Sequence, residues 1–90
     1  MPPHTLPPLL DTSAAPALHV ALSNLIGHGA PIVLDGSAVE SAGLACLQLL
    51  TTARLSALRQ GIEFTLVDPS SALCEMASLA CLDSFLDSVA

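Results

Sequence analysis

The feature that most constrains the fold is the stretch of residues 32–54, IVLDGSAVESAGLACLQLLTTAR. A short β-branched run ends at Asp35, a loop of small residues follows, and an apolar helix begins near Gly43 or Leu44. This order predicts a buried strand that leads into the N-terminal end of a helix. Backbone N–H groups lie unpaired at such an end, and the helix dipole is positive there. The corner therefore favours a phosphate, a phosphorylated side chain or an acidic group as its ligand.

Strand-like and helix-like segments alternate along the rest of the chain. Apolar residues recur at helical spacing from Leu18 to Ile26 and predict a helix that ends at Gly27 and Gly29. Residues 6–10 are an edge strand or an extended lead-in, because the two prolines there cannot donate ladder hydrogen bonds. The other expected segments are disordered residues 1–5, a strand at 31–35, a loop at 36–42, a helix at 43–59, a strand at 63–67, a turn at 68–71, and helices at 72–79 and 82–89.

This order of elements predicts one α/β domain over residues 1–90. Strands that alternate with helices imply a mostly parallel or mixed sheet with right-handed crossovers, here packed against about four helices. Phe64 and Leu66 should lie on one face of their strand, and Thr65 and Val67 on the other. One face or edge of the sheet should stay sparsely covered, which would favour a homodimer. The expected core positions of the long helix are Leu44, Leu47, Leu50, Leu55 and Leu58.

Charge and composition exclude several classes of function. The chain has a formal net charge of −6 and only two cationic side chains, Arg54 and Arg59. Nucleic-acid binding needs several cations to neutralise phosphates, so neither nucleic acid nor an anionic membrane surface is an expected partner. No apolar run reaches the length of a membrane span, and the N-terminus lacks the pattern of a secretory signal. A basic protein surface is the partner that electrostatics favours.

Reactive side chains form no catalytic pattern. The three cysteines, an odd number, lie in apolar helical contexts and are interpreted as reduced core residues of a cytoplasmic protein. The three histidines lack the spacing of a metal site, and the sequence places no histidine beside a serine or cysteine as nucleophilic catalysis would need. We therefore expect no enzyme activity, no metal and no cofactor.

The run VLDGSAVESAGLACLQLLTTAR, followed by QGIEFTLVDPSSAL, resembles the STAS domain of sulfate transporters and anti-sigma-factor antagonists, in particular its small stand-alone bacterial members. The resemblance rests on the strand that ends in Asp35, on Leu-Gln-Leu-Leu at residues 47–50, on Arg54, and on Pro69-Ser70 at the start of a helix. It implies a non-enzymatic protein–protein interaction module. In regulatory members, a partner kinase phosphorylates a Ser or Thr at the start of the long helix.

The phosphoacceptor motif of the family, Asp-Ser/Thr-x-Gly-Leu, falls without gaps on residues 43–47, Gly-Leu-Ala-Cys-Leu. The acceptor position is then Leu44, which has no hydroxyl. A shifted alignment instead matches Ser41 to the acceptor but needs a deletion in the loop. The departure at Leu44 is typical of a constitutive adaptor, such as the small cytosolic subunit of a lipid-transport ABC complex.

The predicted partner-binding surface comprises the loop at 36–42, the first turns of the long helix and the turn at 69–71. Its partner would be an anti-sigma factor of the histidine-kinase type, a chemotaxis or signalling component, or an ABC ATPase. Asp35 could orient an acceptor hydroxyl, meet a partner cation or cap the loop backbone, and Ser37 and Ser41 are acceptors or caps. The predicted contact residues are Asp35, Ser37, Glu40, Ser41, Leu44 and Ser70, with Ser41 as the candidate phosphoacceptor.

Overall fold

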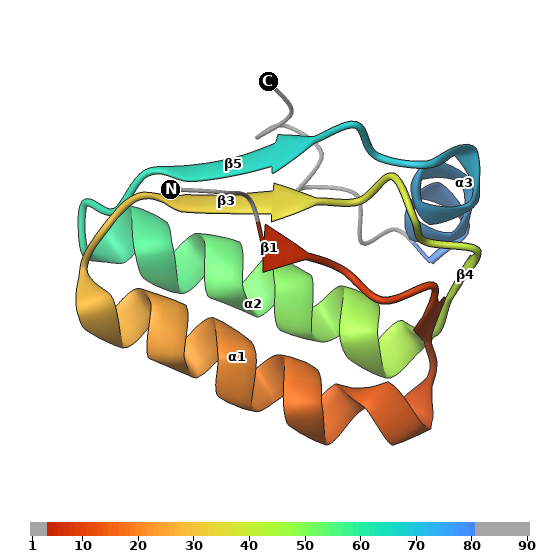
Figure 1. Ribbon diagram of the computed structural model, residues 1–90, viewed down its shortest axis with the longest axis horizontal. Coiled ribbons are helices and arrows are strands. Elements are labelled where there is room, and N and C mark those ends of the chain that lie inside the picture. Colours follow the sequence, from red (N-terminus) through yellow and green to blue (C-terminus); the bar gives the residue numbers. More distant parts are fainter. Residues whose placement is uncertain (1–3, 81–90) are drawn as a thin grey trace.

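The computed structural model describes residues 4–80 (Figure 1). Two parallel sheets, three α-helices and one short 3-10 helix make up this part of the chain. In chain order the elements are β1 (His4–Thr5), β2 (Leu9–Leu10), η1 (Thr12–Ala14), α1 (Ala15–His28), β3 (Ile32–Asp35), β4 (Ser41–Ala42), α2 (Leu44–Arg59), β5 (Phe64–Val67) and α3 (Ser71–Leu79). The prediction of an α/β fold is confirmed, with three α-helices in this range rather than about four. The helix predicted at 82–89 lies outside the described residues.

The main sheet has the strand order β1-β3-β5 and is parallel throughout. Ile32 pairs with Phe64 and Leu34 with Leu66, and all four side chains are buried, whereas the residues between them are half-buried. The predicted shared face of Phe64 and Leu66 is confirmed. Because both crossovers move along the sheet in the same direction, a constant crossover hand places α1 and α2 on one face, as Figure 1 shows.

The N-terminal segment departs from the prediction. Residues 4–5 were expected to be disordered, yet they form β1 beside β3. The single segment expected at 6–10 is divided at Pro7-Pro8, because proline cannot donate to the ladder. Beyond the prolines, β2 pairs in parallel with β4, which lies inside the region expected to be a loop. These two short strands form a ribbon separate from the main sheet.

The predicted stop of α1 is confirmed at Gly29, whereas Gly27 lies within the helix. Asp11 caps the preceding 3-10 turn, since its carboxylate accepts hydrogen bonds from the Ala14 backbone N–H at 3.2 Å and from the Ser13 hydroxyl at 2.6 Å. These bonds, that of Ser13 first, lower the pKa of Asp11 below its ordinary 3.8. Pro16 lies in the first helical turn, where its missing donor costs little. Gly29 ends α1 in the left-handed conformation at φ 70°.

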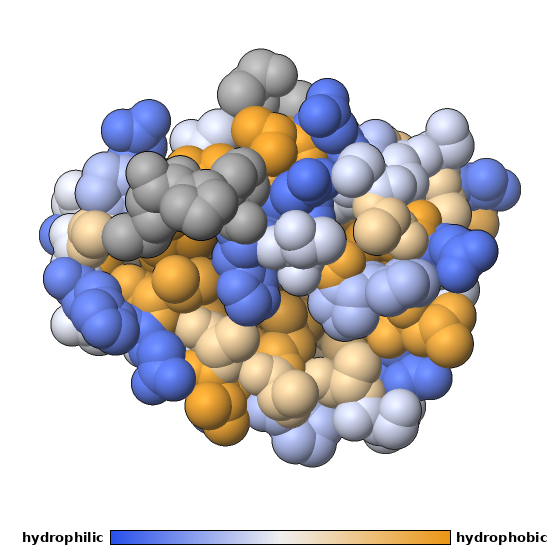
Figure 2. Space-filling model, viewed as in Figure 1, coloured by the Kyte–Doolittle hydropathy of each residue, from blue (hydrophilic) through white to orange (hydrophobic). Residues whose placement is uncertain are grey.

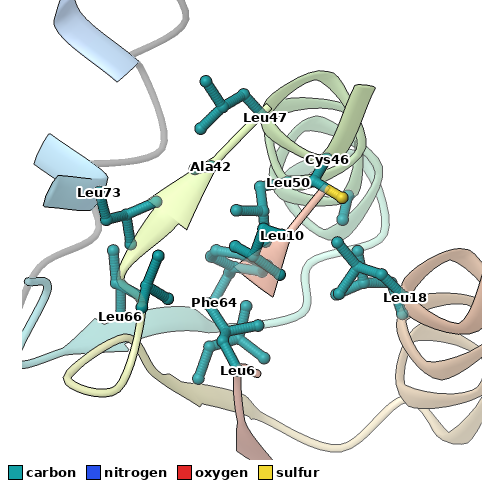
Figure 3. Close-up of a cluster of buried hydrophobic side chains, with 14 of the residues drawn as sticks. Leu6, Leu10, Leu18, Ala42, Cys46, Leu47, Leu50, Phe64, Leu66 and Leu73 are labelled. Carbon is teal, nitrogen blue, oxygen red and sulfur yellow. The ribbon is translucent and has the colours of Figure 1, made fainter. Parts of the chain in front are cut away.

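The hydrophobic core lies between the main sheet and its helices (Figure 3). Figure 3 shows Leu6 and Phe64 in the middle of the cluster with Leu50 of α2, Leu18 of α1 at one side of it, and Leu66 beside Leu73 of α3 at the other. Every large side chain in this core except Phe64 is aliphatic. Its fully buried members include Leu6, Leu10, Ile32, Leu34, Cys46, Leu47, Leu50, Leu66 and Leu73.

The predicted core face of α2 is partly wrong. Leu47 and Leu50 are buried, but Leu44, Leu55 and Leu58 are exposed by 57%, 44% and 55%. At about 100° per residue, these three exposed side chains lie about 80–140° around the helix axis from Leu50, so they face away from it. The buried face instead carries small residues that let α2 approach its neighbours closely: Cys46, Ala53 and Ala57.

Candidate functional site

One end of the molecule brings together the segments that the sequence predicted as a site. The carboxyl ends of β3 and β5 lie there with the start of α2 and the start of α3 (Figure 1). We call residues 35–44 and 68–71 the β3–α2 corner. Main-chain and side-chain hydrogen bonds hold both of its segments in place.

Gly36 joins the two segments of the corner. Its N–H donates to the Val67 carbonyl at 3.0 Å, and its carbonyl accepts from the Ser70 N–H at 3.1 Å. A Cβ atom at this position would lie 3.0 Å from Leu73 Cδ2 and 3.3 Å from Pro69 Cα. Only glycine lets the loop after β3 lie this close to the start of α3.

Asp35 and Ser37 form the entrance to the loop. The Asp35 carboxylate accepts a hydrogen bond from the Ser37 backbone N–H at 2.9 Å, so the loop-capping role weighed for Asp35 is observed. Hydrogen bonding from Ser37 lowers the pKa of Asp35 below its ordinary 3.8, and the side chain of Ser37 has a larger effect than its backbone N–H. The carboxylate is therefore charged at neutral pH, which suits contact with a cation.

Glu40 and Ser41 are held by their backbones and leave their side chains exposed. Both N–H groups donate to the Pro8 carbonyl, at 2.7 Å and 3.2 Å. The Gly43 N–H donates to the Leu10 carbonyl at 2.7 Å. The backbone carbonyls of Pro8 and Leu10, just before and within β2, thus hold the loop in place.

Leu44 is the first residue of α2, and its side chain is 57% exposed. The preceding residue, Gly43, is the N-cap and supplies no side-chain hydrogen bond to the helix. Five of the six predicted contact residues thus lie along one loop and helix start, and Ser70 lies on the adjoining turn. The fold brings all six to the same corner.

Leu9 also belongs to this surface, although the sequence did not indicate it. It pairs with Ser41 in the β2–β4 ribbon, and paired residues of parallel strands point to the same side. Its side chain is 55% exposed, whereas Leu10 and Ala42 point into the core. A strand of two residues leaves no alternating pattern in the sequence, so only the pairing reveals Leu9.

Ser70 has an observed structural role as the N-cap of α3, since its Oγ accepts from the Leu73 N–H at 3.1 Å. Ser70→Ala should therefore lower the free energy of unfolding by about 1 kcal/mol. Ser70→Asp, which keeps an acceptor and adds a favourable charge at the helix start, should retain wild-type stability. Urea unfolding followed by circular dichroism measures both values. Equal stability of Ser70→Ala and the wild type would contradict the capping role.

Other parts of the described chain offer weaker sites. An open groove of about 650 Å³ lies between α1 and α2, and its lining contains His19, Gln48 and Leu49 but no acid, lysine or arginine. Within residues 4–80, no three His, Cys, Asp or Glu side chains are grouped to hold a metal ion. Burial first, and the charge of Asp11 second, raise the pKa of the Cys46 thiol above its ordinary 9.0, so the thiol stays protonated at neutral pH. None of these features matches the corner as a candidate site.

None of the helices within residues 4–80 combines the length and apolar character that a membrane span requires.

Comparison with known proteins adds one finding. The family model described as "Mlab, STAS domain" matches residues 9–87 of the 90-residue chain. No curated protein and no solved structure gave a significant match. The family match covers nearly the whole chain and includes the β2 segment, all of α2 and the β3–α2 corner. The chain therefore belongs to the STAS domain family.

Proposed function

We propose that this protein is a non-enzymatic STAS module that binds another protein through the β3–α2 corner, as an anti-sigma-factor antagonist-like regulator or a constitutive adaptor. The observation that carries the proposal is Leu44, an exposed leucine at the first position of α2. The proposed partner is an anti-sigma factor of the histidine-kinase type, a chemotaxis component or an ABC ATPase. The cytoplasm is the compartment that these partners imply.

The chemistry of the corner supports a contact that does not depend on phosphorylation. Leucine cannot be phosphorylated, and covering its exposed half with a partner would contribute about 1 kcal/mol. Ser37, Glu40 and Ser41, in the loop that leads to Leu44, are exposed and polar. An apolar anchor within a polar rim is the usual anatomy of a protein interface. Charged Asp35 and Glu40 favour a partner whose surface is basic there.

Leu44→Asp should weaken partner binding at least ten-fold, because a carboxylate would have to be desolvated in the interface. The candidate partners are the proteins encoded beside this gene, and isothermal titration calorimetry of purified pairs gives the affinity. Val20→Asp is the matched control, since Val20 is equally exposed, at 57%, but lies on α1. Loss of binding in the control with full binding of Leu44→Asp would move the interface away from the corner.

A second candidate function is a phosphorylation switch at Ser41. It is favoured by the position of Ser41, which is exposed and lies three residues before α2. A phosphoryl group would add about −1.5 to −2 charges beside an acidic loop and an apolar anchor, where its desolvation and its repulsion by neighbouring carboxylates would disrupt binding. Mass spectrometry after incubation with a partner kinase and ATP tests this function. Phosphate on Ser41 that disappears in Ser41→Ala supports it, and an unmodified chain excludes it.

A further inference from the structure

The outer face of α2 carries a stripe of exposed leucines that no described element covers. Leu44, Leu55 and Leu58 are each at least 44% exposed. At about 100° per residue, these three side chains fall within about 60° of one another around the helix axis. They extend over about 21 Å of helix, at 1.5 Å per residue. We call these three residues the α2 stripe.

The polar group at the middle of the α2 stripe, the hydroxyl of Thr51, already has a hydrogen-bond partner within the helix. Thr51 lies midway between Leu44 and Leu58, and its hydroxyl donates to the Leu47 carbonyl at 3.0 Å. The hydroxyl therefore needs no partner from another molecule, and the γ-methyl group of Thr51 remains for apolar contact. No acidic side chain occurs anywhere on α2.

Charges are divided between the two ends of the stripe. Both cationic side chains of the chain, Arg54 and Arg59, lie in the second half of α2. Glu40 lies at the other end, in the loop that leads into α2, and its side chain is exposed. Figure 2 shows hydrophobic surface beside hydrophilic surface at the edge of the molecule where Figure 1 places β4 and the start of α2.

We propose that the α2 stripe docks a second copy of this chain in an antiparallel arrangement. A two-fold axis passing near Thr51 brings Leu44 of each copy against Leu58 of the other. The same axis brings the basic end of each helix to the acidic end of its neighbour, and the two helix dipoles run in opposite directions. The surface is thus complementary to itself, as a two-fold interface requires.

The size of the stripe sets the strength of the dimer. Three half-exposed leucines are far from covering the roughly 800 Å² per partner of a standard stable interface. The overall charge of −6 on each copy opposes association, although physiological salt screens charges more than about 8 Å apart. We therefore expect a weak dimer that forms at micromolar to millimolar protein concentration.

Sedimentation equilibrium of the purified full chain over this concentration range tests the proposal. Leu58→Asp should weaken dimerisation at least ten-fold, because two-fold symmetry places the substitution in the interface twice. Val20→Asp adds the same charge at an equally exposed position on α1 and should leave dimerisation unchanged. A wild-type chain that stays monomeric at millimolar concentration, or equal effects of the two variants, would overturn the proposal.

Charge reversal separates the specific arrangement from general repulsion. Glu40→Lys reduces the net charge to about −4, so general repulsion alone would strengthen the dimer. The antiparallel arrangement requires the opposite, because the new lysine would face Arg59 of the second copy. Arg59→Glu should also weaken the dimer, and the double variant, whose net charge equals that of the wild type, should restore it. Stronger association of Glu40→Lys alone would exclude this arrangement.

The dimer and the proposed partner complex can be tested separately. Leu58 and Arg59 lie outside the β3–α2 corner, and sedimentation of the purified chain involves no partner. An experiment can therefore show dimerisation without partner binding, or partner binding without dimerisation. If both occur, they should exclude each other, since both cover Leu44.

Discussion

Leu50→Ala is expected to lower the free energy of unfolding by about 2–5 kcal/mol, the usual cost of removing a fully buried leucine side chain. Leu50 has no exposed surface and points from α2 into the centre of the core (Figure 3). A small domain has only about 5–15 kcal/mol of stability in total. The variant should therefore unfold at a much lower urea concentration than the wild type, or be unfolded at 37 °C.

Leu55→Ala is the matched control for this effect. Leu55 lies on the same helix but is 44% exposed, so its truncation should cost less than about 1 kcal/mol. Chemical unfolding followed by circular dichroism measures both variants. Equal losses at the two positions would mean that the face of α2 assigned to the core is wrong.

Gly36→Ala should lower the free energy of unfolding by about 1–3 kcal/mol, the cost of adding a methylene group to a well-packed region. The new Cβ would lie 3.0 Å from a buried leucine methyl of Leu73 and 3.3 Å from the backbone of Pro69. The leucine is fully buried and the backbone atom cannot rotate away, so the loop after β3 must separate from α3. This separation would also widen the β3–α2 corner.

Gly27→Ala makes the same chemical change in open space. No atom lies within 4 Å of the position that its Cβ would take, and Gly27 lies within α1. This variant should be more stable than the wild type by up to about 1 kcal/mol, because alanine is the better helix former. Thermal unfolding distinguishes the two. If Gly36→Ala also gained stability, the close approach of the two segments would be refuted.

The longer elements could be read from the chain because their residues carry the signal locally. The β-branched run at 32–35, the proline-free apolar stretch of α2 and the capping turn at Ser70 each specify their own conformation. Alternating burial in β5 likewise matched the expected face of Phe64 and Leu66. The position of the β3–α2 corner follows from these elements alone, since a parallel strand must deliver its loop to the next helix.

The short strands and the helix face could not be read in this way. Each of β1, β2 and β4 has two residues, too few for a period, and each exists only through its pairing with a distant segment. The leucines of α2 are equally apolar inside and outside the core. Which of them is buried depends on the direction from which the sheet and α1 approach the helix.

The sequence by itself determined the alternation of strands and helices, the acidic character of the molecule and the absence of a hydroxyl at Leu44, because these properties belong to single residues or to neighbours in the chain. Only the tertiary structure decided that Leu9 lies beside Ser41, that Gly36 is pressed against the start of α3, and that Leu44, Leu55 and Leu58 remain exposed on one face of α2. These are relations between segments far apart in sequence. They are set by packing and by backbone hydrogen bonds, which no local pattern encodes.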